Sequence, residues 1–465
     1  MRYSMGRGLF SVLSGALWLT TAAWGAGEFE FNGYLRTGTN YSEGMTKGVC
    51  YRENVSAIGN PGRFGNECDN LLEIVGKSYL FGSPNNSQPW VTLNVTGQLF
   101  YAGDRSEEAV TSDDPGRLST GNETIFQFPN TYVEMGNVVG RGSIIWAGRR
   151  WYRRLMFYQS DIFTLNNNGN GFGVYDIEVG PGKLHLAVMR RIENREVEDE
   201  AGNTSVQAGP SYNTFDARYS TQIGALPIDF IYLHQRTGAK DAYGDSDESY
   251  ERAQGNLFAL FSEYYGAFSN RAYIGYGTGL FGQGADYHIG AGHLSYSGFG
   301  LTQTEWEARE EATSFRVINE VGLELIPDEL NFNISALYSE VTDIAQEQTD
   351  DDGNVTGYEA VDGYNYSIGL KPQYFINKHW SFVIDLAHTM QERDDYTEPH
   401  TLNKGTFGTV IRPQIKSMPG AAEFRLYATR ASWDKDANYP GDKGSALYGE
   451  RGSGNTYGVQ VDVAW

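Results

Sequence analysis

Apolar and polar residues alternate along most of this chain with a period of two. In residues 91–99 the odd positions are apolar apart from Gly97, and the even positions are polar. Residues 331–338 alternate in the same way, and residues 457–465 place a tyrosine, three valines and a tryptophan on one face. Because successive side chains of a strand point to opposite faces, each segment predicts a β-strand with one apolar and one polar face. About 18 such segments, each roughly 8–12 residues long, follow one another from Phe29 to Trp465.

Two kinds of connection join these segments. Some are short, such as 181–182 and 376–379, and others are long, polar and acidic, such as 104–121 and 239–250. Alternating short and long connections are typical of a barrel with one turn side and one loop side. No linker or shift in composition marks a second domain, so we predict one domain over residues 26–465.

The hydropathy of the chain argues against a helical membrane protein and is compatible with a membrane β-barrel. Mean hydropathy is −0.45, and beyond the first residues no apolar run approaches the ~18 residues that a membrane-spanning helix requires. Alternating strands escape such a test, since lipid can solvate their apolar faces while their polar faces line a lumen. We therefore predict an all-β fold: a closed antiparallel transmembrane β-barrel of about 18 strands, with short periplasmic turns and long extracellular loops. A soluble, secreted all-β protein is the alternative.

The first residues have the features of an export signal. Two arginines precede an apolar stretch, and Ala-Trp-Gly at 23–25 fits a small-x-small cleavage pattern, so residues 1–25 predict a signal peptide. The remaining chain would then work outside the cytoplasm, where disulfides persist. Cys50 and Cys68 are the two cysteines of the chain. We expect them to pair, which would stabilise the fold by about 3 kcal/mol in the chain-entropy description.

Charge and motifs exclude several functions. With 36 Lys+Arg against 58 Asp+Glu, the net charge is −22, which argues against nucleic acid as a partner.

Residues 277–282 have the spacing of a dinucleotide fingerprint but lead into more loop, so they predict a turn. The acidic run at 350–354 lacks the ligand spacing of a calcium loop and predicts a solvated loop. The seven histidines form no catalytic or metal motif. We predict a protein that is not an enzyme and has no metal and no cofactor.

One arginine-rich segment stands out in this acidic chain. It consists of Arg149, Arg150, Trp151, Tyr152, Arg153 and Arg154, followed by Phe157, Tyr158, Asp161 and Phe163. It is either a cation-rich strand end balanced by nearby carboxylates or a channel constriction. Guanidinium groups and carboxylates exchange hydrogen bonds with hydroxyls. Aromatic faces can stack on sugar rings at roughly 1 kcal/mol per ring, by analogy with aromatic pairs. Weak, repeated sites of this kind suit translocation.

Three passages together carry a family resemblance. They are residues 31–38, the segment from Cys50 through 63–68 to Glu73, and residues 142–154, with a weaker echo at 424–434. In order and in the bracketing cysteines, they resemble the maltoporin (LamB) family of sugar-specific outer-membrane porins. The resemblance implies an 18-stranded barrel, a homotrimer and a third loop that folds inward and narrows the channel.

The resemblance also implies roles for single residues, because the family guides sugars along aromatic rings flanked by a charged track. At matching positions it assigns Tyr34 to stacking and assigns the polar track to Arg36, Arg63, Glu73, Arg154 and Asp161. Phe163 aligns with a constriction tyrosine and lacks its hydroxyl. Further candidates for the channel lining are Gln127, Arg150, Trp151, Tyr152 and Tyr158.

The chain also departs from the family pattern. Leu71 stands where a second slide tyrosine is expected, Gln127 aligns with an arginine, and Met156 aligns with an aspartate. The scaffold inference is therefore stronger than any inference about maltodextrins.

From these observations we predict an outer-membrane channel for passive diffusion of neutral sugars or oligosaccharides, maltodextrin-like or other. Its further partners would be membrane lipid, lipopolysaccharide and two more copies of itself. Within transport, the alternatives are a channel for acidic oligosaccharides and a general small-solute porin. Outside transport, they are an outer-membrane hydrolase on a barrel scaffold and a structural barrel with a plugged lumen.

Overall fold

The structure is a computed structural model of the 465-residue chain. It describes residues 29–42, 51, 62–65, 67, 70–84, 87–101, 117–119, 124–160, 162–198, 204–237, 254–282, 310–349, 355–394, 397–413, 422–434 and 452–465. The predicted signal peptide (1–25), both cysteines of the predicted disulfide and Asp161 lie outside the described residues. Within the described part, no helix is long and apolar enough to span a membrane.

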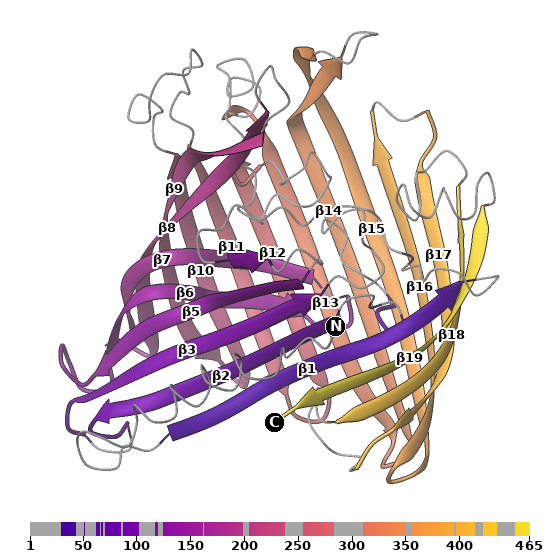
Figure 1. Ribbon diagram of the computed structural model, residues 1–465, viewed down its shortest axis with the longest axis horizontal. Helices are drawn as coiled ribbons and strands as arrows, with labels where there is room; N and C mark the ends of the chain where they lie inside the picture. The colour runs from indigo at the N-terminus through magenta and orange to yellow at the C-terminus, as the bar shows by residue number, and fades with distance from the viewer. Residues whose placement is uncertain are drawn as a thin grey trace, which may run out of the picture.

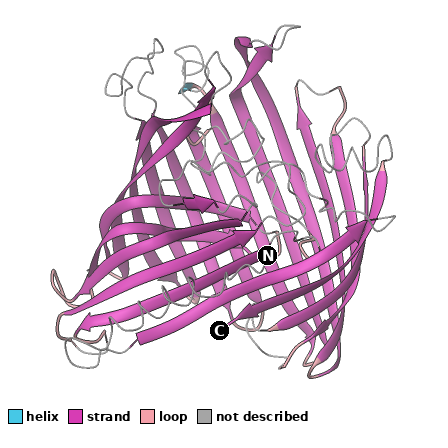
Figure 2. Cartoon of the chain, in the orientation of Figure 1, coloured by secondary structure: helices cyan, strands magenta, loops and turns pink. Residues whose placement is uncertain are grey.

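Strands make up nearly all of the described structure (Figure 2). In chain order they are β1 (Phe29–Ser42), β2 (Asn70–Phe81), β3 (Trp90–Tyr101), β4 (Arg117–Ser119), β5 (Thr124–Gly136), β6 (Ile144–Phe157), β7 (Ile162–Val179), β8 (Gly182–Glu198), β9 (Thr204–Ile223), β10 (Leu226–Thr237), β11 (Gln254–Tyr265), β12 (Ser269–Gly279), β13 (Thr313–Ile326), β14 (Leu330–Thr349), β15 (Val355–Asn377), β16 (Trp380–Arg393), β17 (His400–Ile411), β18 (Glu423–Trp433) and β19 (Ser453–Ala464).

The sheet closes on itself. Each long strand pairs antiparallel with its neighbours in sequence, and β1 pairs with both β2 and β19 (Figure 1). The short strand β4 pairs only with β5, which also pairs with β3. The ring therefore has 18 strands, with β4 as one extra strand. This confirms the predicted closed antiparallel barrel. The two-residue connections 180–181 and 224–225 are turns, as the short segments between strands predict.

Alternation along the strands sorts side chains between the two faces of the barrel wall. On β10, Ile231 and Leu233 are buried in an interior cluster, while Phe230 is 44 % exposed on the other face. The same contrast recurs around the ring, where outward aromatic and aliphatic side chains are exposed; examples are Phe172, Phe215, Phe258, Tyr276, Ile368, Leu386 and Phe407. Such an exposed apolar outer face is what lipid requires of a membrane barrel.

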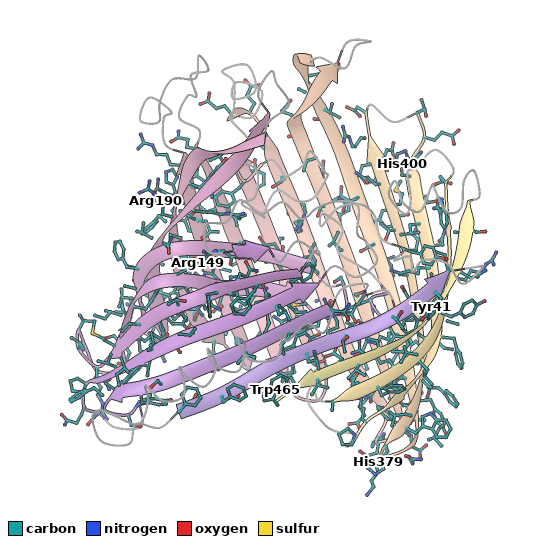
Figure 3. The ribbon with its side chains drawn as sticks, in the orientation of Figure 1. Tyr41, Arg149, Arg190, His379, His400 and Trp465 are labelled. Carbon is teal, nitrogen blue, oxygen red and sulfur yellow. The ribbon has the colours of Figure 1, made fainter. Side chains whose placement is uncertain are left out.

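The seam between the first and last strands depends on one glycine. Gly33 and Trp465 exchange backbone hydrogen bonds, with N–O distances of 2.9 and 3.1 Å. A Cβ atom at Gly33 would lie 2.1 Å from the Trp465 ring, so only glycine fits beneath the indole. Figure 3 shows Trp465 beside β1 at this seam.

β5 and β6 pair over only part of their length. Where they separate, the end of β6 turns into the lumen and narrows it. The two strands pair only from Thr131–Gly136 to Ile144–Arg149. Beyond that point β4 occupies the edge of β5, and β6 pairs with β7 alone. Arg153 has a φ of 44°, and the register of β6 shifts next to it, which turns the end of this strand away from the wall.

The ends of β6 and β7 fold into the barrel. Their side chains Leu155, Phe157, Ile162 and Leu165 pack against inward-facing residues of β10 to β14. These are Ile231, Leu233, Leu257, Ala259, Phe261, Tyr273, Ile318 and Leu337. The β6–β7 connection is therefore the inward-folded segment that the sequence predicted. The glycine run at 277–282 ends β12 and forms a turn, with Gly279 at a φ of 58°, which confirms the turn prediction.

Candidate functional site: the channel constriction

A second segment, from the first long connection, also lies inside the barrel. Phe64 packs on Val383, Val410 and Tyr427, which come from β16, β17 and β18. Its backbone N–H donates to an oxygen of the Asp385 carboxylate at 3.1 Å. We call residues 62–65 and 67 the first-loop tip. Its contacts fix it against the inner wall on the side of the barrel where β16 to β18 lie.

Glu67 is the electrostatic centre of the first-loop tip. Its side chain is 1 % exposed and accepts from three guanidinium groups. Arg36 of β1 lies 2.6 Å away, Arg425 of β18 lies 3.0 Å away, and Arg63 donates from within the tip itself. Burial alone would raise the pKa of the Glu67 carboxyl, but the three guanidiniums together lower that pKa well below its usual range.

The cluster continues from Arg425 to Tyr34. Arg425 Nη2 lies 2.8 Å from Glu423 and 3.1 Å from Asp462, and the Tyr34 hydroxyl donates to the same Asp462 oxygen at 3.1 Å. Arg412 completes the network with a 2.6 Å contact to Glu423. The chain of contacts holds the ring of Tyr34 at a fixed height on β1, half-buried beside the first-loop tip.

A carboxylate on the opposite wall holds the tip of the β6–β7 segment. Glu320 of β13 accepts from the backbone N–H groups of residues 158, 159 and 160 at 2.9, 2.7 and 3.0 Å, and from the Ser160 hydroxyl at 2.8 Å. The ring of Tyr158 lies 4.6 Å from the Arg271 guanidinium, next to this site on β12. One side chain therefore satisfies three backbone donors that the tight turn leaves without a sheet partner.

The two inward segments meet inside the barrel. Arg63 of the first-loop tip donates from Nη1 to the carbonyl oxygen of Tyr158 at 3.3 Å. Both segments thus cover the inner wall from β10 to β18. On the inner faces of β1, β2, β3 and β5, the half-buried side chains include those of Tyr34, Glu73, Gln98 and Gln127.

The partly exposed wall carries a row of polar side chains. Gln98 of β3 donates to Glu73 of β2 at 2.7 Å, and Gln127 of β5 donates to Gln98. On the inward-turned part of β6, the Arg154 guanidinium stacks over the Trp151 ring at 4.2 Å. Arg154 and Arg36 both act electrostatically on Glu73. Acceptors, donors and an aromatic face are therefore gathered on this half-buried part of the inner wall. We call this surface, formed by Tyr34, Glu73, Gln98, Gln127, Trp151 and Arg154, the open wall.

Two other candidates from the arginine-rich segment are packed into the wall. Arg150 pairs with Glu134 at 3.1 Å and lies 4.4 Å from the Tyr132 ring. Tyr152 is fully buried and stacks on Trp146 with ring centroids 5.2 Å apart. These contacts fit the first of the two interpretations of the segment, a cation-rich strand end balanced by carboxylates.

The predicted site residues thus fall into groups. Brought together around the open wall or the first-loop tip are Tyr34, Arg36, Arg63, Glu73, Gln127, Trp151 and Arg154. Tyr158 lies at the tip of the β6–β7 segment. Phe163 pairs through its backbone with Met156, and its side chain lies outside the described part, as does Asp161. The roles assigned to all of these residues stay predictions.

Sequence reasoning missed several residues that hold the constriction together. They are Glu67, Gln98, Glu320, Asp385, Arg425 and Asp462. Glu67 follows Arg63 by four residues, which is a local signal. Arg425, Asp462 and Glu320 had only their polar positions in alternating strands. Within the described ranges, no group of three or more His, Cys, Asp or Glu side chains is arranged to hold a metal ion.

A closed antiparallel ring with an apolar outer face and two segments folded into its lumen defines a pore-forming membrane barrel of the porin class. The LamB porin family model matches residues 29–465, and the chain belongs to the LamB porin family. It is therefore an outer-membrane porin.

The chain is also similar to known maltoporins and can be aligned with solved structures of outer-membrane proteins. A maltoporin of Photobacterium profundum is 28% identical over 228 residues, which is 46% of this chain and 50% of that protein. A maltoporin of Vibrio cholerae is 26% identical over 388 residues, which is 82% of this chain and 83% of that protein. Among solved structures, OmpT of Vibrio cholerae aligns with a TM-score of 0.41 and 11% identity, covering 95% of this chain and 100% of that one. OccK1 of Pseudomonas aeruginosa aligns with a TM-score of 0.45 and 10% identity, covering 94% and 98%.

Proposed function

We propose that this porin is a channel for passive, saturable diffusion of neutral sugars, most simply oligosaccharides, across the outer membrane. The observation that carries the proposal is the open wall of the constriction. There the Trp151 ring and the half-buried Tyr34 ring accompany a row of carboxylate, amide and guanidinium groups. Rings offer faces for the apolar side of a sugar, and the polar groups exchange hydrogen bonds with its hydroxyls. The maltoporin relatives support the same class of substrate.

The working form that we propose is a homotrimer, exported by its N-terminal signal and acting without catalysis or a cofactor. Transport would follow the sugar gradient, since each contact is weak and the solute must leave as readily as it enters.

Planar-bilayer recording with purified protein tests the proposal. Neutral sugars of increasing chain length should block the ion current in a saturable manner. Trp151→Ala and Tyr34→Ala should each weaken that block about fivefold, because each removes a stacking face worth about 1 kcal/mol, and both should leave the pore open. Tyr276→Ala is the matched control, since this tyrosine lies on the outer face of the barrel. Arg154→Ala should alter both conductance and sugar block.

The same recording separates the alternatives. Current without block by any neutral sugar would indicate a general porin, and absence of current would indicate a plugged barrel. A channel for acidic oligosaccharides has a specific observation in its favour, the cluster of Arg36, Arg63 and Arg154 beside the open wall. Block by acidic sugars at lower concentration than by neutral ones of equal length, with anion-selective reversal potentials, would favour it.

A further inference from the structure

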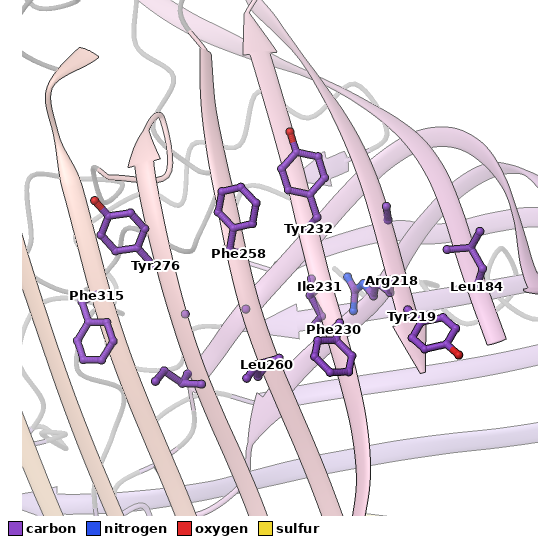
Figure 4. Close-up of a pocket in the computed structure, with 14 residues that line it drawn as sticks. Leu184, Arg218, Tyr219, Phe230, Ile231, Tyr232, Phe258, Leu260, Tyr276 and Phe315 are labelled. Carbon is purple, nitrogen blue, oxygen red and sulfur yellow. The ribbon is translucent and has the colours of Figure 1, made fainter. Parts of the chain in front are cut away.

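An apolar groove runs over the outer face of the barrel from β8 to β13. Its volume is about 550 Å³, and its larger lining side chains include Phe230, Tyr232, Phe258, Leu260, Tyr276 and Phe315 (Figure 4). The register places these side chains in two rows across neighbouring strands. Residues that alternate with them, such as Ile231 and Leu257, belong to the interior cluster, so the groove faces away from the lumen.

A row of polar residues lies beyond this groove, on the side of the long connections. Register pairs join Asn170, Arg190, Asn213, Arg236 and Gln254 across five neighbouring strands, from β7 to β11. Their alternating neighbours Met189 and Gln235 are buried inside, so both arginines point outward, and both are exposed. Figure 3 shows Arg190 on the outer side of the barrel.

The two arginines form a local cationic site. One strand, β9, separates them, so their Cα atoms lie roughly 10 Å apart. Within the described residues, neither guanidinium has a carboxylate at ion-pair distance. Arg236 follows Tyr232 by four residues on the same strand face, and one polar pair, His234 and Asn256, lies between the cationic row and the apolar groove. Two exposed cations this close together form a local positive patch on a chain with a net charge of −22, and such a patch attracts an anionic group.

We propose that this face binds a phosphate-bearing glycolipid of the outer leaflet. The guanidiniums of Arg190 and Arg236 bind the phosphate groups of its head, and an acyl chain lies in the groove between the aromatic rows. Guanidinium groups match phosphate with paired, charge-assisted hydrogen bonds. Each contact is placed at the depth that its chemistry requires: phosphate at the polar rim and hydrocarbon against the apolar band.

Native mass spectrometry of the full chain in detergent tests this site. The probe is bisphosphorylated lipid A, and the same glycolipid stripped of its phosphates is the comparison. The double variant R190Q/R236Q should bind the phosphorylated probe about tenfold more weakly, as loss of charge-assisted hydrogen bonds predicts. The wild type should prefer the phosphorylated probe by a similar factor.

Arg430→Gln is the matched control, because Arg430 is also exposed on the outer face, on the distant strand β18. It should bind the probe as the wild type does. Phe258→Ala should weaken both forms of the probe, since it removes part of the groove and leaves the cations in place. Equal binding by the double variant and the wild type would overturn the proposal. So would an equal loss in Arg430→Gln, or a shift in oligomer mass in the double variant, which would indicate a second copy on this face.

Discussion

The two segments inside the barrel are held by different physical means. The first-loop tip has a small apolar contact, formed by Phe64 with three wall residues, and a buried ionic cluster around Glu67. The β6–β7 segment rests on a large apolar cluster spanning β10 to β14. The carboxylate that holds its tip, Glu320 of β13, accepts from neutral backbone groups. The first is secured mainly by charge and the second mainly by burial.

This difference predicts how each segment fails. A buried charge cluster is sensitive to the loss of one member, because the remaining charges are left uncompensated in a poorly hydrated place. An apolar cluster spreads its stabilisation over many contacts, so it tolerates the loss of one polar partner at its edge. Substitutions in the two segments should therefore have unequal effects on the channel.

The largest effect is expected for Glu67→Ala. It leaves three guanidiniums of the cluster without their shared carboxylate, which should destabilise docking of the first-loop tip by about 3–5 kcal/mol. Single-channel conductance should rise as the tip leaves the lumen. Glu340→Ala, a change on the outer face, should leave conductance as it is. Unaltered conductance in Glu67→Ala, with the barrel folded, would mean that charge does not hold the tip.

A smaller effect is expected for Glu320→Gln. The carboxamide keeps one acceptor for the turn at 158–160 and loses the charge-assisted bonds, a cost of about 1–3 kcal/mol. The apolar cluster should keep the segment inside, so current noise should increase while mean conductance stays near the wild-type value. Glu324→Gln, an exposed residue four positions further along the same strand, serves as the control. If mean conductance rose as much as in Glu67→Ala, burial would not be the main force on this segment.

The smallest effect is expected from mild acid. The pKa of Glu67 in the folded protein lies below its usual value, so its contribution to stability is fully present above the usual value. That contribution is lost only as the pH falls through the lowered pKa. Conductance and sugar block should therefore change little between pH 7 and about pH 5. A rise in conductance over this interval would show that a different group controls the tip.

The sequence predicted the architecture well for a physical reason. Period-two alternation is a local signal, and it is strong in strands such as β3 and β16, so the number of strands and the closed barrel followed from it. The inward turn of β6 was suggested by the arginine-rich segment and by family resemblance. Its cause, a φ of 44° at Arg153 and a register shift, has no local sequence signature.

The partners of the site residues were much harder to predict. Glu67 contacts Arg425, 358 positions along the chain, and Glu320 binds a turn 160 positions before it. Such pairs depend on where strands from distant parts of the chain meet, and alternation sets the face of a residue without setting its partner. Arg150 and Tyr152 illustrate the same limit, since they share a motif with Trp151 but pack into the wall.

The glycine beneath the Trp465 indole has a consequence for biogenesis. The two strands that it joins are the earliest and the latest described, so the ring cannot be completed until nearly the whole polypeptide is available. Until then, both borders of the growing sheet have unsatisfied backbone groups and require a helper surface or shelter from other chains. A bulky residue at position 33 would leave these borders apart, and the resulting open sheet would be a substrate for proteolysis and aggregation rather than a pore.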